Sequence, residues 1–182
     1  MKVLITAPMY CSDQMKNVME YAHQSFDEVI LNPFARTMTQ EEIAAMWDGA
    51  DAVIAGVESW DAEFIAKAPA GLKILARNGI GYDNVDVSAA NARGITVTVT
   101  RQANSDAVAD CTFALMLALA RHIIPMNAAV HSGSWGYAVA DDVHAKTIGI
   151  LGFGAIGQRI AKRAAGFEME ILAHDPYLSR EQ

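Results

Sequence analysis

Short apolar runs alternate with segments of helical hydrophobic spacing along the first hundred residues, and this alternation constrains the fold more than any other feature. Between two of the runs, for example, Met15, Val18, Met19 and Ala22 recur at helical spacing. Strands that are separated by helices form parallel sheets with both faces covered. The pattern therefore predicts an α/β fold that begins with a flavodoxin-like parallel sheet. Its strands are expected at residues 3–8, 28–31, 52–57, 73–76 and 95–99.

Capping residues indicate where helices of this domain begin and end. The run Thr39-Gln40-Glu41-Glu42 fits a capping box, in which a threonine and a glutamate three residues later satisfy free backbone amides. Asp86 is expected to cap a helix that runs to Ala92, and Gly94 lies where that helix should stop. These signals support the placement of helices between the strands.

The pattern changes near residue 100, which predicts a first domain at 1–100 and a second at 101–182. Asn104-Ser105 opens a long helix that extends to His122. Its stretch Cys111–Ala120 is apolar throughout, which predicts a helix buried inside the protein. This stretch has about half the length of a membrane span, so no membrane association is expected. A second helix at 125–131 and a polar loop anchored by Trp135 are expected to follow.

Residues 152–157, GFGAIG, match the pattern G-x-G-x-x-G between an apolar run at 146–151 and a helical segment. Gly152 would permit the tight turn, Gly154 the close approach of a pyrophosphate, and Gly157 the packing of helix against strand. The free amides of Ala155 and Ile156 would then face the anion at the start of the helix. The spacing and context predict the first βαβ part of a Rossmann dinucleotide-binding domain.

Asp175 follows the next apolar run, 18 positions after Gly157. A carboxylate there can accept hydrogen bonds from the adenosine ribose and would repel a 2′-phosphate, which favours NAD over NADP. Arg180, five residues further on, could weaken that preference. Two alternatives remain at this point: a glycine turn that only packs the βαβ unit, and a Rossmann unit for FAD or S-adenosylmethionine.

A second glycine-rich turn, RNGIGYDN, follows the apolar run at 73–76. Such a turn can direct several backbone N–H groups at one anion. The residues alone are equally consistent with an ordinary strand-to-helix turn whose aspartates cap the next helix.

Composition excludes several partner classes. The formal net charge is −7 and the 14 basic residues form no block, so nucleic acid is not an expected partner. The two cysteines, Cys11 and Cys111, form no CxxC pair, which indicates neither a zinc site nor a disulfide framework. Free thiols fit a reducing compartment, and a cytoplasmic location is expected. No metal is expected.

Three segments resemble the D-isomer-specific 2-hydroxyacid dehydrogenases, the group that includes phosphoglycerate, glycerate, D-lactate and formate dehydrogenases. They are LKILARNGIGYDNVDVSAANARGITVTVT, ANSDAVADCTFALMLALARHI and HAKTIGILGFGAIGQRIAKRAAGFEMEILAHDPY, in the family's order and spacing. The sequence departs from a common family form at Thr100-Arg101-Gln102, where many members have Thr-Pro-Gly.

The resemblance implies an NAD-dependent oxidoreductase that acts on a small D-2-hydroxy acid or its 2-keto acid, possibly 3-phosphoglycerate, hydroxypyruvate or glyoxylate. It implies a substrate domain followed by an NAD-binding domain. Backbone amides near Asn78 and Gly79 would bind the substrate carboxylate, while Ile80 and Thr112 would lie near the cofactor. The resemblance also implies a homodimer formed through the nucleotide domain.

The catalytic Arg, Glu and His of the family occur later than residue 182, so no catalytic residue is assigned. None of the five histidines stands in a pattern with a carboxylate that indicates an acid–base pair. We therefore expect a C-terminally truncated chain that lacks turnover by itself. The alternatives are a non-catalytic NAD(H)-binding module and another Rossmann enzyme, such as a methyltransferase.

Overall fold

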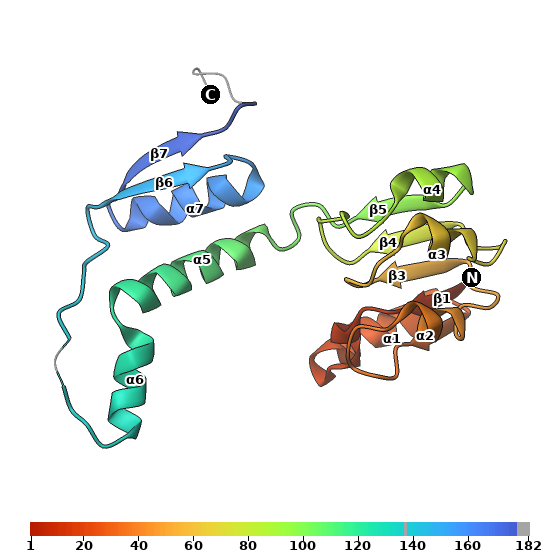
Figure 1. Ribbon diagram of the computed structural model, residues 1–182, viewed down its shortest axis with the longest axis horizontal. Helices are drawn as coiled ribbons and strands as arrows, with labels where there is room; N and C mark the ends of the chain where they lie inside the picture. Colours follow the sequence, from red (N-terminus) through yellow and green to blue (C-terminus); the bar gives the residue numbers. More distant parts are fainter. Residues whose placement is uncertain (137, 178–182) are drawn as a thin grey trace. The chain divides into compact units, whose positions relative to one another are not determined.

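The computed structural model describes residues 1–136 and 138–177 (Figure 1). The chain divides into two compact units, Met1–Arg101 and Gln102–Gln182. This division lies beside the point at which the sequence pattern changes.

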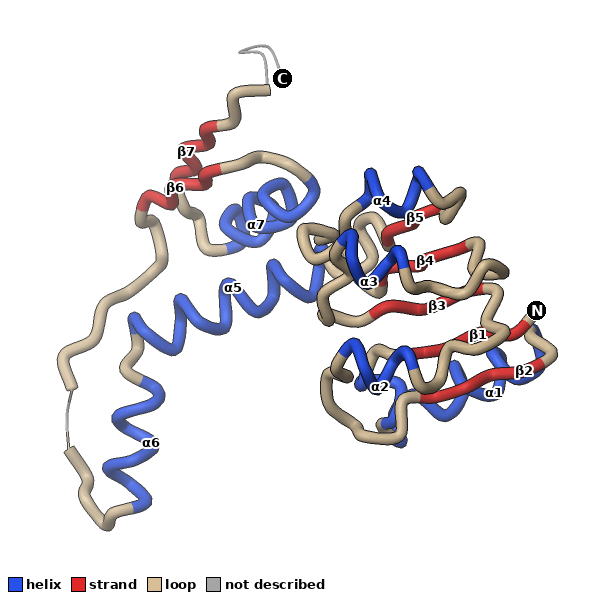
Figure 2. The backbone as a smooth tube through the Cα atoms, turned by 45° about the vertical axis from the view of Figure 1, so that its right-hand side comes forward, coloured by secondary structure: helices blue, strands red, loops and turns tan. Residues whose placement is uncertain are grey.

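The first unit contains one parallel sheet of five strands (Figures 1 and 2). The strand order is β2-β1-β3-β4-β5, which is the flavodoxin-like order, and it confirms the predicted fold class. Two of the strands, β1 and β3, end before their apolar runs do, because the last residues of these runs turn into the following loop. The strand β2 has the expected bounds, β4 is shifted by one residue, and β5 begins one residue later than expected. Their bounds are β1 Lys2–Ile5, β2 Glu28–Leu31, β3 Ala52–Ala55, β4 Ile74–Arg77 and β5 Thr96–Val99.

Helices connect these strands, and their caps follow the sequence signals. Thr39 accepts from the N–H of Glu42 while the Glu42 side chain accepts from the N–H of Thr39, which confirms the capping box. Asp86 accepts from the N–H of Ala89 at 2.9 Å, and Gly94 has a φ of +71° beyond the helix end. The helices are α1 Lys16–Ser25, α2 Gln40–Ala44, α3 Ala62–Ala66 and α4 Val87–Ala92, and two 3₁₀ turns, Pro8–Cys11 and Asp13–Met15, precede α1.

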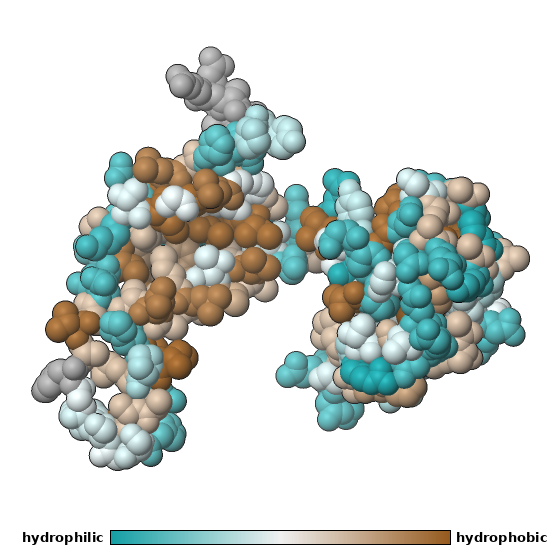
Figure 3. Space-filling view, viewed as in Figure 1, coloured by the Kyte–Doolittle hydropathy of each residue, from teal (hydrophilic) through white to brown (hydrophobic). Residues whose placement is uncertain are grey.

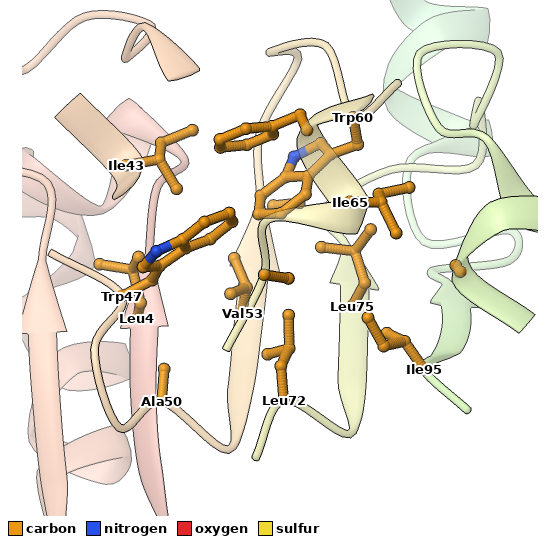
Figure 4. Packing of buried hydrophobic residues seen from close by; sticks show 14 of the residues in the cluster. Leu4, Ile43, Trp47, Ala50, Val53, Trp60, Ile65, Leu72, Leu75 and Ile95 are labelled. Carbon is orange, nitrogen blue, oxygen red and sulfur yellow. The ribbon is translucent and has the colours of Figure 1, made fainter. Parts of the chain in front are cut away.

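The main core of the first unit lies against the face of the sheet that carries Leu4, Val53 and Leu75 (Figure 4). Three aromatic rings extend this core: Trp47 stacks on Phe64 with ring centroids 4.7 Å apart, and Trp60 lies 5.1 Å from the same ring. Buried aromatic clusters of this kind contribute much of the burial energy of a small domain. The core therefore holds the loops at the carboxyl ends of β1, β3 and β4 on a rigid base.

The second unit combines three helices with a two-stranded parallel sheet. Arg163 of the helix at Ala155–Gly166 donates to Asp110 of the helix at Ser105–Ala120 at 2.6 Å. The rings of Phe113 and Phe167 stack with their centroids 5.3 Å apart. The strand β6 leads into α7 and then into β7, which is the predicted βαβ unit. The elements are α5 Ser105–Ala120, α6 Ile123–His131, β6 Thr147–Leu151, α7 Ala155–Gly166 and β7 Glu170–His174.

The expectation that the long helix is buried is wrong for most of its length. Only Ser105, Ala109 and Phe113 of α5 are buried, whereas Leu119 is 78% exposed, because α7 covers only the first half of the helix. Apolar side chains accordingly gather on the visible face of this unit (Figure 3). Trp135, expected to be an anchor, is 84% exposed.

Among the described residues, no single helix combines the length and the apolar character of a membrane span. Helices α5 and α6 together have the length and composition of a span, but a bend of 62° separates them.

Candidate functional site

The glycine turn of the second unit joins the end of β6 to the start of α7. Gly152 has a φ of +88°, a conformation that residues with a side chain rarely adopt, and its N–H donates to the carbonyl oxygen of His174 at 2.8 Å. Gly154 is the N-cap of α7 and makes no side-chain cap. The turn therefore leaves the start of the helix open.

The other two glycines have different surroundings. A Cβ on Gly157 would overlap the carbonyl oxygen of Gly152 and lie 3.3 Å from the Cγ2 atom of Ile150, so the helix packs directly on the turn and strand. A Cβ on Gly154 would meet nothing within 4 Å. Gly157 thus serves packing within the unit, and Gly154 faces space that a ligand could occupy.

Free donors collect at this position. Among the described residues, no acceptor lies within hydrogen-bond distance of the N–H of Ala155 or Ile156, while the N–H of Gln158 is the first to bond back to the turn, at the carbonyl of Gly154. Unpaired amides at a helix start attract anions, and the helix dipole adds to the attraction. The first turn of α7 can therefore bind a phosphate group.

Asp175 lies next to this turn. Its Oδ2 atom accepts from the N–H of Phe153 at 2.7 Å, and its Oδ1 atom accepts from the N–H of Tyr177 at 2.9 Å. The amide of Tyr177, followed by that of Phe153, lowers the pKa of the Asp175 carboxyl. Each carboxylate oxygen keeps a further lone pair. The carboxylate is therefore ionised near neutral pH and can still accept from ribose hydroxyls.

The second glycine-rich turn follows β4, at the carboxyl edge of the five-stranded sheet. The amides expected to bind an anion are already engaged: the N–H of Asn78 donates to Ala55 and that of Gly79 donates to Arg77, both at 2.9 Å. For the N–H groups of Ile80 and Gly81, no acceptor is found within the described part of the chain. The free donors of this turn thus lie two residues later than the sequence indicated.

Side chains hold the second turn from both sides. Tyr10 donates through its hydroxyl to the side-chain oxygen of Asn78 at 3.4 Å, and the amide of Asn78 contacts the sulfur of Met9. Arg77 donates to the side chain of Asn84 and to the carbonyl oxygen of Asn78. Arg77, Gly81 and Asn84 lie within the turn that the sequence marked, but the free amide of Gly81 and the side-chain contacts of Arg77 and Asn84 were not predicted, because such contacts are not visible in a motif.

The remaining candidate residues are Thr112, the histidines and Arg180. Thr112 is on α5, where its hydroxyl donates to the carbonyl of Val108 at 2.8 Å. The next residue, Phe113, stacks on Phe167, the residue that follows the last turn of α7. The assignment of Thr112 to the cofactor stays a prediction. His131 has a bond to the carbonyl of Asn127, and within the described residues none of the five histidines is hydrogen-bonded to a carboxylate. No group of three or more metal-ligating side chains occurs among residues 1–136 and 138–177. Arg180 lies outside the described residues.

A flavodoxin-like parallel sheet, followed by a βαβ unit with a glycine turn at the start of its helix, defines a two-unit α/β protein with a Rossmann-type nucleotide-binding motif. The family model of the D-isomer specific 2-hydroxyacid dehydrogenase catalytic domain matches residues 3–174. The chain belongs to this family, which confirms the resemblance seen in the sequence.

Known relatives agree with this assignment. The chain is 34% identical over 182 residues to a D-3-phosphoglycerate dehydrogenase of Methanocaldococcus jannaschii, covering 99% of this chain and 33% of the relative. It is 48% identical over 124 residues to a glyoxylate reductase of Pyrococcus horikoshii, covering 63% of this chain and 37% of that protein. The chain thus spans about a third of the length of these relatives.

Solved structures show the same fold. The NAD+-bound 3-phosphoglycerate dehydrogenase of Entamoeba histolytica superposes with a TM-score of 0.78 at 25% sequence identity, covering the whole of this chain and 56% of that chain. The relatives are dehydrogenases and reductases, so the methyltransferase alternative finds no support.

Proposed function

We propose that the protein takes part in hydride transfer between a nicotinamide dinucleotide and the C2 carbon of a small D-2-hydroxy acid. A bound nicotinamide would supply the hydride acceptor in the oxidative direction, where C2 would lose a hydride and the hydroxyl a proton to leave the 2-keto acid. The observation that carries this proposal is the open start of α7, with its free amides, beside the Asp175 carboxylate that is bonded to the same turn.

Each turn has a separate task in this proposal. The amides of Ala155 and Ile156 hold the pyrophosphate, Gly152 and Gly154 shape the approach, and Asp175 receives the ribose hydroxyls. Gly157 contributes by keeping α7 close to the turn.

The substrate side of the proposal rests on the turn after β4. The free amides of Ile80 and Gly81 can bind a carboxylate, with Asn78 and Gly79 forming the backbone that directs them. Ile80 and Thr112 are proposed to line the nicotinamide. No acid–base residue for the proton is assigned among the described residues.

NAD is the proposed cofactor in preference to NADP. The ionised Asp175 would repel the 2′-phosphate of NADP, while its free lone pairs accept from the two ribose hydroxyls of NAD. Replacement of Asp175 by alanine should reduce the preference for NAD about tenfold to a hundredfold, because hydrogen bonds to a charged acceptor are lost.

Titration of the chain with NADH and NADPH, followed by nicotinamide fluorescence, tests the cofactor site. Asp175→Ala should weaken NADH selectively, and Gly154→Ala should weaken both dinucleotides because a Cβ enters the space for the pyrophosphate. Asp141→Ala, an exposed aspartate of the same unit, is the matched control and should change neither. Unaltered NADH binding in both variants would contradict the proposal.

A homodimer in the cytoplasm completes the proposed function. The exposed apolar side chains of α5 and α6, including Leu115, Leu119 and Ile124, support a partner surface on the second unit. The free cysteines Cys11 and Cys111 agree with a reducing compartment. Sedimentation of the protein at several concentrations tests the dimer.

A further inference from the structure

Arg77 is the last residue of β4, and its guanidinium is bonded to residues of the glycine-rich turn that follows this strand. Its Nε atom donates to the side-chain oxygen of Asn84 at 3.3 Å, and its Nη1 atom donates to the carbonyl oxygen of Asn78 at 2.5 Å. The same guanidinium lies 3.1 Å from where a Cβ of Gly79 would be. The head group thus spans the turn from one end to the other.

Asn84 connects this turn to the loop after β3. The side-chain amide of Asn84 donates to the main-chain carbonyl oxygen of Glu58 at 2.6 Å, and the main-chain carbonyl oxygen of Asn84 accepts from the main-chain N–H of Trp60 at 2.7 Å. Arg77 and Asn84 together therefore join the turn that carries the free amides to a second loop at the same edge of the sheet.

The second loop is held by the Glu58 side chain, whose Oε1 atom is hydrogen-bonded and whose Oε2 atom is buried without a partner among the described residues. Glu58 is buried, and its Oε1 atom accepts from the N–H of Gly56 at 2.9 Å, from the indole N–H of Trp60 at 3.2 Å and from the hydroxyl of Thr6. These donors come from the ends of β1 and β3 and from the start of the next helix. The clamp formed by Arg77 and Asn84 is therefore anchored in the core.

The loops around this turn carry few positive charges. The loops after β1, β3 and β4, at residues 6–12, 56–60 and 78–86, contain no lysine or arginine. Their exposed large side chains are apolar or phenolic: Met9, Val57, Ile80 and Tyr82. A phosphate on the distal carbon of a substrate would find no cation in these three loops. Elsewhere at this edge, Arg36 follows β2 and is paired with Glu42, Arg77 is bonded within the turn, and Arg101 follows β5.

We propose that Arg77 is a positioning residue that holds the amides of Ile80 and Gly81 in place, and that the loops after β1, β3 and β4 accept a 2-hydroxy or 2-keto acid whose distal substituent carries no charge. The inference rests on the proposed function, because it presumes that these two amides receive the substrate carboxylate. It assigns the guanidinium to the turn, where its planar fork reaches two acceptors that an ammonium group cannot reach together.

The test compares D-glycerate with D-3-phosphoglycerate, which differ only by the distal phosphate. Binding is measured from the amide NMR signals of Ile80 and Gly81 in the 182-residue chain and in the variants Arg77→Met, Arg77→Lys and Asn84→Ala. A misplaced turn should weaken both ligands equally, by about tenfold. Arg77→Lys should behave like Arg77→Met, because the lost feature is the fork and not the charge.

Two controls separate positioning from other effects. Arg93→Met removes an arginine that donates to the carbonyls of Ile65 and Ala66 elsewhere in the same unit, so it should leave both affinities unchanged. Arg101→Met tests the arginine that follows β5 and should also leave the ratio of the two affinities unchanged.

A loss confined to D-3-phosphoglycerate in an Arg77 or Arg101 variant, or full binding in Arg77→Lys, would overturn the inference. Spectra of the ligand-free chain test the clamp independently of binding. Arg77→Met and Asn84→Ala should shift the amide signals of Ile80 and Gly81 and increase the hydrogen-exchange rates of these two amides. Unchanged spectra would refute the clamp. If neither ligand moves these signals in the unmodified chain, the proposed substrate site and the substrate class both fail, whatever the clamp does.

Discussion

Replacement of Gly157 by alanine tests the packing of the dinucleotide turn most directly. The new Cβ would lie closer than 3.0 Å to the carbonyl oxygen of Gly152, a main-chain atom that cannot rotate away. Overpacking of this kind costs about 3 kcal/mol at the upper end of its range, and alanine in place of glycine in a helix returns up to about 1 kcal/mol. The net cost is about 2 kcal/mol, which is roughly thirtyfold in an equilibrium constant.

Hydrogen exchange of the amides in β6 and α7 is the appropriate assay, because the aromatic core of the first unit would dominate a fluorescence signal. In Gly157→Ala these amides should exchange about thirtyfold faster, in keeping with about 2 kcal/mol. Gly166→Ala, the same substitution at the far end of α7, meets nothing within 4 Å and should slow exchange or leave it unchanged. Equal protection in the two variants would refute the assigned role of Gly157.

Three further predictions concern the backbone strain at Gln102 and the ion pairs of Arg36 and Arg163. Gln102→Gly should raise the thermal midpoint, with a gain of about 0.5–1 kcal/mol, because Gln102 has a φ of +61° and a left-handed conformation strains any residue with a side chain; Gln102→Ala, which keeps the strain, should not. The Glu42 carboxyl has a pKa of about 2, chiefly because Arg36 donates to it, so it stabilises the fold above its ordinary pKa of 4.5 and ceases to do so as the pH falls toward 2; a carbon-13 NMR titration of Arg36→Met should show that pKa returning toward 4.5. Arg163→Met should speed hydrogen exchange in α5 more at low salt than in 1 M NaCl, because its exposed partner Asp110 is screened by salt.

The separate roles of Gly154 and Gly157 show that two glycines of one sequence pattern can have different functions. At Gly157 the missing side chain permits contact within the protein, whereas at Gly154 it leaves space outside. Both occur within a single G-x-G-x-x-G run. An identical substitution at the two positions should therefore affect stability in one case and ligand binding in the other.

Much of the fold was accessible from local patterns. The five strands, the capping box at Thr39 and the glycine stop at Gly94 all depend on residues within a few positions of each other, so periodicity and backbone preference suffice to predict them. The βαβ unit around residues 152–157 was predictable for the same reason. The burial of the long helix was not, because it depends on how far α7 extends along α5.

The sequence by itself determined the flavodoxin-like order of elements and the dinucleotide turn, since hydrophobic period and glycine placement are properties of the chain. The family followed from the resemblance of three segments to known dehydrogenases. The tertiary structure alone decided which donors are free. Asn78 gives its N–H to Ala55, a residue of the neighbouring strand, and so the open amides belong to Ile80 and Gly81. A hydrogen-bond donor is available only when no distant acceptor reaches it, and that depends on packing that no local pattern records.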